Sequence, residues 1–419
     1  ELFVMDDGWF GRKYRRINDN SSLGDWVVDT EKLPHGIKGL TDVAGKYGIK
    51  FGIWIEPEFT NTKSELIDHH PDWVLRAGSR DLSCGRGGTQ VALDLCNPKV
   101  QDFVFHVVDT LLANYPDIAY IKWDANGELL NYGSSYLPKD KQSHIYIDYH
   151  RGLVRVMERI RAKYPEIKII GSSGPQSEGE DFDYLWPEMR RLKVDLVDEH
   201  FYRSPEWFLN GAKRYDSYDR QGPKVFAGEY ACHSVNRENS FLTALCEAAF
   251  MTGFERNADV VCLCTYAPLF AHVDAWQWRP DLIWFDNLSL VKTPNYYVQQ
   301  LYGHNAGTNV VPLTMQGEPV TGQLDLYATA AVDKHSDELI IKVANTGIRN
   351  KRIKLNLNGL SAGKHKGTLT LLHSSDLEAK NTLCNPSTVV PLVSDIEVEA
   401  PQGEVNLRPL SFSVYRIKL

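Results

Sequence analysis

Residues Ala119–Trp123 form a short, mostly apolar run, Ala-Tyr-Ile-Lys-Trp, that is followed by Asp124, and this pattern indicates the fold class. Such a run, followed by a helical pattern, is typical of a parallel strand that is buried on both faces. The same pattern predicts seven further strands, at Leu2–Met5, Lys50–Ile55, Gln90–Leu93, Ile167–Ile170, Leu196–Val197, Lys224–Ala227 and Val260–Cys264. Eight strands with helices between them predict a (β/α)8 TIM barrel, a fold of roughly 250 residues.

The pattern changes after about residue 308. Alternating strands such as Glu338–Asn345, Lys351–Asn358 and Ser411–Ile417 follow one another there without a long amphipathic helix. We therefore expect a catalytic barrel over residues 1–308 and a C-terminal β-sandwich over residues 309–419.

Composition narrows the class of protein. Apolar residues make up 43% of the chain and charged residues 24%, which is typical of a folded protein. The net charge of −8, without a basic tract, argues against a nucleic-acid partner. No apolar stretch approaches the ~18 residues that span a membrane, and no signal peptide is recognisable. We therefore expect a soluble protein without a membrane partner. The sequence does not indicate its compartment. The seven Cys show no zinc spacing, and neither a metal nor a cofactor is expected.

Six of the eight predicted strands end on Asp or Glu, several beside Trp or Tyr. In a barrel, these strand ends meet at the catalytic face. Carboxylates beside aromatic rings suit a carbohydrate, because they accept hydrogen bonds from hydroxyl groups and offer a stacking surface. Glycoside hydrolysis needs two carboxyl groups on either side of the scissile bond, and Asp124 and Glu229 are the best-placed pair. For any single acid, helix capping or hydrogen bonding at the rim is an equally good interpretation.

Residues 1–165 resemble the half-barrel of family 36 glycoside hydrolases, the retaining α-galactosidases. The motifs are Met5-Asp6-Asp7-Gly8-Trp9-Phe10, Leu23-Gly24-Asp25-Trp26, Gly52-Ile53-Trp54-Ile55-Glu56-Pro57-Glu58, His70-Pro71-Asp72-Trp73, Leu93-Asp94-Leu95 and Tyr120-Ile121-Lys122-Trp123-Asp124. The resemblance implies that Asp124 is a nucleophile and that the sugar hydroxyls are held by Asp6, Asp7, Trp54 and Lys122. Asn126, two residues beyond Asp124, is counted with the substrate-binding residues.

Residues 166–308 and the C-terminal sandwich instead resemble family 51 α-L-arabinofuranosidases. The motifs are Ser172-Ser173-Gly174-Pro175, Phe182-Asp183-Tyr184-Leu185-Trp186, Val197-Asp198-Glu199-His200-Phe201-Tyr202, Pro205-Glu206-Trp207-Phe208, Phe226-Ala227-Gly228-Glu229-Tyr230-Ala231, Tyr266-Ala267-Pro268 and Trp276-Gln277-Trp278. This resemblance implies that Glu229 is the nucleophile and that Tyr202 and Gln277 line the sugar subsite. His200 is expected to orient Glu229 or Tyr202.

Neither half of the chain contains the acid/base motif of the family that it resembles. The Ser-Asp-Asp-type motif of family 36 is absent, and Asp124 stands where family 51 has an Asn-Glu motif. The most economical scheme therefore makes Glu229 the nucleophile and Asp124 a substitute acid, with weak activity as a consequence. Glu128 is an alternative acid, although a solvated loop or helix-start role is the better interpretation of that residue. Glu199 and His200 could also reach the site, with hydrogen bonding at the rim as the equal alternative.

The two halves read as a chimera, natural or engineered, that is joined near residues 163–170. The first functional hypothesis is a retaining, exo-acting α-L-arabinofuranosidase, and the second is an α-galactosidase. The third is a catalytically silent scaffold or sugar-binding protein. The sequence leaves open whether the protein forms a homo-oligomer.

Overall fold

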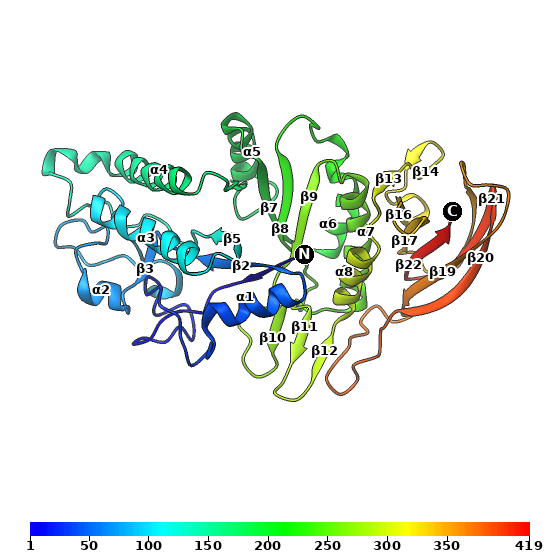
Figure 1. The fold of residues 1–419 in the computed structure, drawn as a ribbon, viewed down its shortest axis with the longest axis horizontal. Helices are drawn as coiled ribbons and strands as arrows, with labels where there is room; N and C mark the ends of the chain where they lie inside the picture. The colour runs from blue at the N-terminus through cyan, green and yellow to red at the C-terminus, as the bar shows by residue number, and fades with distance from the viewer. Residues whose placement is uncertain (169) are drawn as a thin grey trace. The chain divides into compact units, whose positions relative to one another are not determined.

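The computed structural model describes residues 1–168 and 170–419, and the chain divides into two compact units, Glu1–Ile167 and Lys168–Leu419 (Figure 1). The predicted strand at 167–170 contains residue 169, which lies outside the described residues. The strand found next to it is β6, Ile170–Ser172.

Unit 1 contains a three-stranded parallel sheet in the order β1-β2-β5. Trp54 on β2 is the register partner of Lys122 on β5, so both side chains start from the same face of the sheet. The elements of this unit are β1 (Leu2–Met5), α1 (Gly36–Lys46), β2 (Lys50–Ile55), β3 (Phe59–Asn61), α2 (Glu65–His69), η1 (Arg86–Gly88), β4 (Gln90–Ala92), α3 (Pro98–Asn114), β5 (Ile118–Trp123), η2 (Lys139–His144) and α4 (Ile145–Lys163). Helix α3 begins at Pro98 because the Asn97 side chain accepts a hydrogen bond from the Lys99 amide.

The third predicted barrel strand is wrong in its pairing. Residues Gln90–Ala92 do form a strand, β4, but it pairs antiparallel with β3, and β2 is hydrogen-bonded directly to β5. A short apolar run shows that a segment is buried and extended, but it does not say which neighbour the segment pairs with.

Unit 2 begins with a four-stranded parallel sheet in the order β6-β7-β8-β9, with helices between its strands. The elements up to the C-terminal β region are β6, α5 (Glu180–Leu192), β7 (Leu196–Arg203), α6 (Pro205–Asn210), η3 (Gly211–Ser217), β8 (Lys224–Cys232), α7 (Phe241–Arg256), β9 (Val261–Tyr266), β10 (Phe270–His272), β11 (Ile283–Phe285), β12 (Leu290–Lys292) and α8 (Pro294–His304). Helix α7 is buried over most of its length, because helices and sheet enclose it from several sides.

Strands β7 and β8 extend well past the positions predicted for their ends. The sequence predicts stops before Asp198 and Glu229, yet β7 continues to Arg203 and β8 to Cys232. Backbone pairing does not require apolar side chains, so polar residues that face one side of a sheet do not end a strand. Register shifts occur in both strands, between Asp198 and His200 and between Ala227 and Tyr230.

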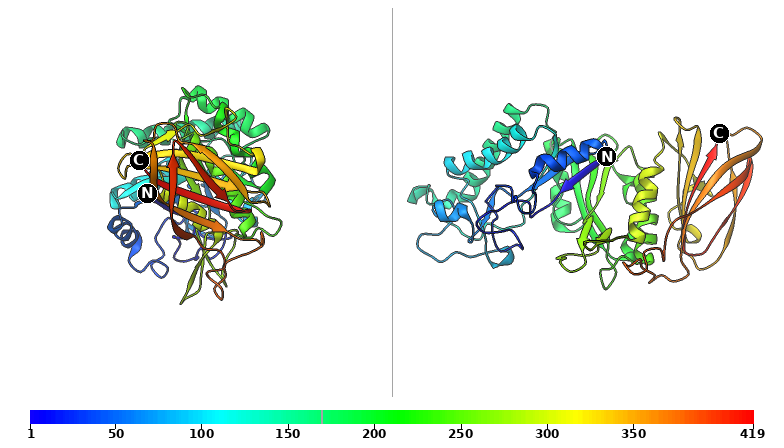
Figure 2. Two further views of the ribbon diagram at one scale, coloured as in Figure 1. Left: turned by 90° about the vertical axis from the view of Figure 1, so that its right-hand side faces the viewer. Right: turned by 60° about the horizontal axis from the view of Figure 1, so that its bottom comes forward.

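The C-terminal region is all-β, as predicted. Its six-stranded sheet has the order β13-β16-β17-β22-β19-β20, and two short ladders, β14-β15 and β18-β21, accompany it. The strands are β13 (Asn309–Val311), β14 (Thr314–Met315), β15 (Glu318–Pro319), β16 (Leu326–Asp333), β17 (Glu338–Asn345), β18 (Lys351–Asn356), β19 (Gly363–His373), β20 (Leu392–Ala400), β21 (Gln402–Leu407) and β22 (Ser411–Lys418), with η4 at Gln323–Asp325. Tyr302 of α8 stacks on Phe412 of β22 at 5.3 Å between ring centroids, so one sheet face packs on the helices (Figure 2).

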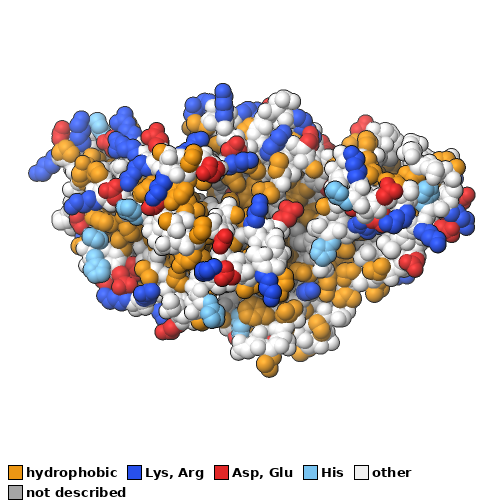
Figure 3. All heavy atoms as spheres, viewed as in Figure 1, with side chains coloured by type: hydrophobic (Ala, Val, Ile, Leu, Met, Phe, Trp, Pro, Cys, Tyr) orange, Lys and Arg blue, Asp and Glu red, His pale blue; other side chains and the backbone are white. Residues whose placement is uncertain are grey.

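Acidic and basic side chains are interspersed on the face drawn in Figure 3. Among the described residues, no helix is both long and apolar enough to cross a membrane.

Candidate functional site

The side chains of strand β7 alternate between a buried core face and a partly exposed face. Val197, Glu199 and Phe201 are buried, whereas Asp198, His200 and Tyr202 are only partly buried. Val197 and Phe201 belong to the core that includes α6 and α7, so the other three side chains start from the opposite face of the sheet.

Glu229 on β8 is held by two side chains of β7. The Tyr202 hydroxyl donates a hydrogen bond to Glu229 Oε2 at 2.9 Å, and His200 Nδ1 lies 3.5 Å from the same oxygen. His200 Nε2 is 2.9 Å from Asp198 Oδ2, so the imidazole joins two carboxylates. The Glu229 side chain is 19% exposed, which leaves the oriented carboxylate open to a small ligand.

Gly228 explains why this arrangement follows a Gly-Glu-Tyr motif. A Cβ at residue 228 would lie 2.1 Å from Asp198 Oδ1, and the Gly228 amide donates to that oxygen at 3.1 Å. Glycine therefore lets Asp198 approach β8 and fix His200.

The prediction that Glu199 could reach the site is wrong. Its carboxylate is fully buried on the core face of β7 and accepts hydrogen bonds from four side chains. These donors are Trp186, Arg214, Tyr215 and Tyr218. The alternation of strand side chains separates Glu199 from His200, and its role is structural.

Aromatic side chains that the sequence reasoning missed lie against Tyr202. The His233 ring stacks on Tyr202 with centroids 5.2 Å apart, and Trp278 meets Tyr202 edge-on at 5.6 Å. Burial, and next the charge of Arg237, lower the pKa of His233 to about 4, so it is a neutral ring at physiological pH. Trp278 brings the loop of the Trp-Gln-Trp motif to Tyr202, and the neighbouring Gln277 is exposed.

In unit 1, Asp124 follows β5 and accepts three hydrogen bonds. Trp54 Nε1 donates to Oδ2 at 2.9 Å, Asn126 Nδ2 donates to the same oxygen at 2.6 Å, and the Ala125 amide donates to Oδ1 at 3.0 Å. Lys122 is the register partner of Trp54 on the neighbouring strand. Glu128, the alternative acid, is an exposed loop residue.

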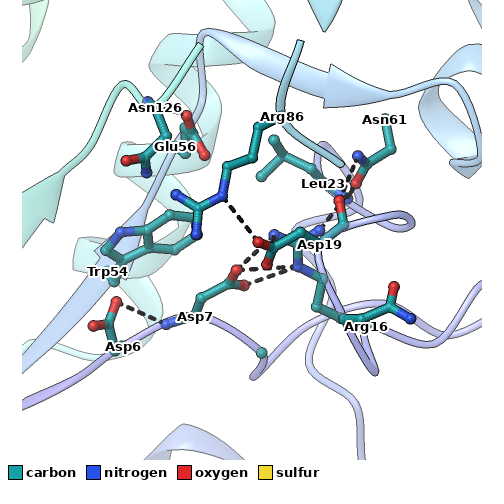
Figure 4. A network of polar contacts seen from close by, with 12 residues as sticks. Asp6, Asp7, Arg16, Asp19, Leu23, Trp54, Glu56, Asn61, Arg86 and Asn126 are labelled. Atoms are coloured by element: carbon teal, nitrogen blue, oxygen red, sulfur yellow. Dashed lines mark hydrogen bonds and ion pairs between the residues drawn. The ribbon is translucent and has the colours of Figure 1, made fainter. Parts of the chain in front are cut away.

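Asp6 and Asp7 follow β1 beside Trp54 (Figure 4). Asp7 is engaged by Arg16, whose Nη2 lies 2.5 Å from Oδ2 and whose Nε donates to Oδ1 at 3.0 Å. The charges continue through Asp19, which lies 3.6 Å from Arg16 and accepts a hydrogen bond from Arg86 Nε at 2.9 Å.

Glu56 is a further carboxyl group in this cluster, and the sequence analysis gave it no role. It is 2% exposed, and its Oε1 accepts hydrogen bonds from the Asn126 amide and from Gln90 Nε2, the latter at 2.8 Å. Burial is the main cause that raises the pKa of Glu56 to about 7, with the charge of Asp124 acting in the same direction. The feature of the sequence that could have identified Glu56 is its position directly after β2.

The structure thus brings the predicted residues together in two sets. Unit 1 gathers Asp6, Asp7, Trp54, Lys122, Asp124 and Asn126, and unit 2 gathers His200, Tyr202 and Glu229, with Gln277 on a nearby loop. The pairing of Asp124 with Glu229 stays a prediction. Within residues 1–168 and 170–419, no cluster of three or more His, Cys, Asp or Glu side chains is placed to hold a metal ion.

Two protein families match different parts of the chain. A family model described as Melibiase matches residues 1–186, and one described as Alpha-L-arabinofuranosidase C-terminal domain matches residues 224–411. The melibiase match ends at residue 186, beyond the joint predicted near residues 163–170. The division between the two compact units, after Ile167, lies within the predicted joint.

Curated relatives of both kinds match the chain, and two of them match about half of it each. The extracellular exo-α-L-arabinofuranosidase of Streptomyces chartreusis is 41% identical over 245 residues, which cover 55% of this chain and 29% of the relative. The α-galactosidase AgaA of Geobacillus stearothermophilus is 42% identical over 174 residues, which cover 42% of this chain and 23% of the relative. The chain therefore spans less than a third of the length of either relative.

The arabinose-bound structure of the GH51 α-L-arabinofuranosidase MgGH51 matches with a TM-score of 0.63 and 22% identity, over 93% of this chain and 58% of that one. This likeness confirms the predicted fold class, a TIM-barrel type of α/β fold with a C-terminal β domain. The chain is thus similar to melibiases in its first part and to α-L-arabinofuranosidases in its second, as its two sets of motifs predicted.

Proposed function

We propose that this protein is a retaining glycoside hydrolase that releases terminal α-L-arabinofuranosyl residues, with Glu229 as its nucleophile. The observation that carries the proposal is the carboxylate of Glu229, held by the Tyr202 hydroxyl at 2.9 Å and by His200 at 3.5 Å while it stays partly exposed. The similarity to arabinofuranosidases supports this sugar, and the aromatic rings of Tyr202 and Trp278 offer an apolar surface beside the carboxylate.

In this mechanism, a Glu229 oxygen attacks the anomeric carbon, and a new C–O bond forms as the glycosidic C–O bond breaks. The leaving oxygen takes a proton from a carboxylic acid, for which Asp124 is the proposed donor. Water, deprotonated by the same group, then releases the sugar with retained configuration. Tyr202 and His200 orient the nucleophile, and His200 is itself fixed by Asp198.

The proposed catalytic domain comprises residues 1–308, followed by a β-sandwich over residues 309–419. Its proposed partner is a carbohydrate, and its net charge of −8 supports this over a polyanionic partner.

α-Galactosidase activity is the second candidate, because unit 1 holds an oriented carboxylate of its own. Asp124 accepts the Trp54 indole N–H at 2.9 Å beside Lys122, and the similarity to α-galactosidases covers this part of the chain. In this alternative, Asp124 is the nucleophile and Asp6, Asp7 and Asn126 contact the sugar.

The test compares hydrolysis of 4-nitrophenyl α-L-arabinofuranoside with that of the α-D-galactopyranoside, using wild type, Glu229→Gln and Asp124→Asn. We expect furanoside hydrolysis that Glu229→Gln abolishes, and an Asp124→Asn defect that is smaller for this activated leaving group. Galactoside hydrolysis that depends on Asp124 and not on Glu229 would favour the second candidate. A folded protein that cleaves neither substrate is the silent scaffold.

A further inference from the structure

Glu56 is a buried carboxyl group that the proposed mechanism does not use. It follows β2 directly and is 2% exposed, which is unusual for an acid without an ion-pair partner in direct contact. Its neighbours are polar rather than basic, because Gln90 and the Asn126 amide both donate to its Oε1.

Asn126 connects Glu56 to Asp124. Its backbone N–H donates to Glu56 Oε1, and its side-chain amide donates to Asp124 Oδ2 at 2.6 Å. The Asp124 amide also donates to the Ile55 carbonyl at 2.8 Å, immediately before Glu56. The loop that carries Asp124 is therefore fastened to the end of β2 at two points.

We propose that Glu56 is a positioning residue that fixes Asp124 through Asn126 and does so in its protonated form. A protonated carboxyl group suits this geometry, because one oxygen acts as a carbonyl acceptor for two N–H donors and the other carries the proton. Glu56 does not touch the sugar in this proposal.

The charged groups that face Glu56 explain why it keeps the proton. Burial is the largest cause that raises the pKa of Glu56 to about 7, and the negative charge of Asp124 acts in the same direction. The hydrogen bonds from the Asn126 amide and Gln90, and the charge of Arg86, lower this pKa without cancelling the effect of burial. Arg86 donates a hydrogen bond from Nε to Asp19 and therefore pairs with Asp19 rather than with Glu56. Ionised Glu56 would place a negative charge beside the Asp124 carboxylate, and the like charges would repel each other across Asn126.

The direct test is infrared titration of the whole protein, which detects the absorption of a protonated carboxyl group and needs no activity. The difference between wild type and Glu56→Gln should show this absorption near pH 6 and lose it through about pH 7. Glu58→Gln is the matched control, because Glu58 is also buried but accepts from Trp123 and Tyr149 and not from Asn126. If the spectrum of wild type minus that of Glu56→Gln shows no protonated-carboxyl absorption at acidic pH, the proposal is overturned.

The kinetic test rests on the proposed function. Above pH 7, we expect the wild-type rate to fall about tenfold per pH unit as Glu56 ionises, whereas Glu56→Gln, neutral at every pH, should retain activity there. Glu56→Ala should lose activity at all pH values, because nothing then holds the Asn126 amide. An alkaline fall unchanged in Glu56→Gln would overturn the proposal. A clear infrared titration in a protein that cleaves no glycoside would overturn the proposed function instead.

Discussion

At the scale of single residues, the hydroxyl group of Tyr202 decides how Glu229 is presented. It donates to Oε2 at 2.9 Å, while the flank of its ring is held by His233 and Trp278. The phenol therefore has one orientation, and its hydrogen bond to a charged carboxylate is of the stronger kind.

We predict that Tyr202→Phe lowers kcat by about ten- to a hundredfold with little change in melting temperature. A hydrogen bond to a charged group contributes roughly 1.5–3 kcal/mol, and about 1.4 kcal/mol corresponds to a tenfold change in rate. Steady-state kinetics on the arabinofuranoside and a thermal melt provide the measurement.

Tyr218→Phe is the control for this substitution. Tyr218 also donates to a carboxylate, at 2.8 Å, but that carboxylate belongs to the buried Glu199. This variant should lower the melting temperature and leave kcat nearly unchanged. If Tyr202→Phe had full activity, the Tyr202 contact would not orient the nucleophile.

The sequence identified Tyr202, His200 and Glu229 because their motifs are local and resemble those of a known family. It did not identify His233 or give Glu56 a role, because the properties that mark them arise from three-dimensional packing. Burial shifts the pKa of both groups, and burial depends on segments that are distant in the chain, such as Trp278 for His233 and Asn126 for Glu56.

At the scale of elements, strand identity was predictable but strand pairing was not. The apolar run at Gln90–Ala92 forms a strand as predicted, yet it pairs antiparallel with β3. The extension of β7 through His200 and Tyr202 was missed for a related reason, since one polar face looks like a strand end in a sequence. The buried Lys342 on β17 could not be foreseen, because its partner Glu255 is far away in the sequence.

Lys342 joins β17 to the helices beneath it. Its Nζ lies 2.5 Å from Glu255 Oε1 on α7 and donates to the Asn305 carbonyl at 2.7 Å, and its side chain is fully buried. Because removal of one partner leaves the other charge buried, we predict that Lys342→Met lowers the free energy of unfolding by about 3–5 kcal/mol. Urea denaturation gives the value.

The double variant Lys342→Met/Glu255→Leu should recover much of that loss, because both charges are then removed together. Lys38→Met is the exposed control, since Lys38 pairs with Asp42 on the surface of α1 and should show no measurable change. A small effect of Lys342→Met would mean that Glu255 finds water or another partner.

At the scale of the whole molecule, three buried carboxyl groups link stability to pH. Burial raises the pKa of Glu247 on α7 to about 8, and it raises those of Glu56 and Asp281 to about 7. Their ordinary values are 4.5 for Glu and 3.8 for Asp, so between these values and pH 7–8 the folded protein binds more protons than the unfolded chain. The stability that they contribute is complete at low pH and is lost as the pH rises through the folded values.

We therefore predict that the free energy of unfolding falls from about pH 5 to about pH 8.5, with each group contributing a slope of at most about 1.4 kcal/mol per pH unit. Carboxylates whose pKa values are lowered act in the opposite direction only at acidic pH, as does Asp333, which accepts hydrogen bonds from the Ser336 hydroxyl and the His335 amide. Stability should consequently be greatest on the mildly acidic side of neutrality. Urea denaturation across this range is the measurement.

Glu247→Gln should flatten the curve of unfolding free energy against pH above pH 5, because its amide has no proton to lose. Glu188→Gln, on the surface of α5, should leave the slope unchanged. A wild-type stability that stays constant or increases up to pH 8.5 would show that the buried carboxyl groups gain compensating contacts when they ionise.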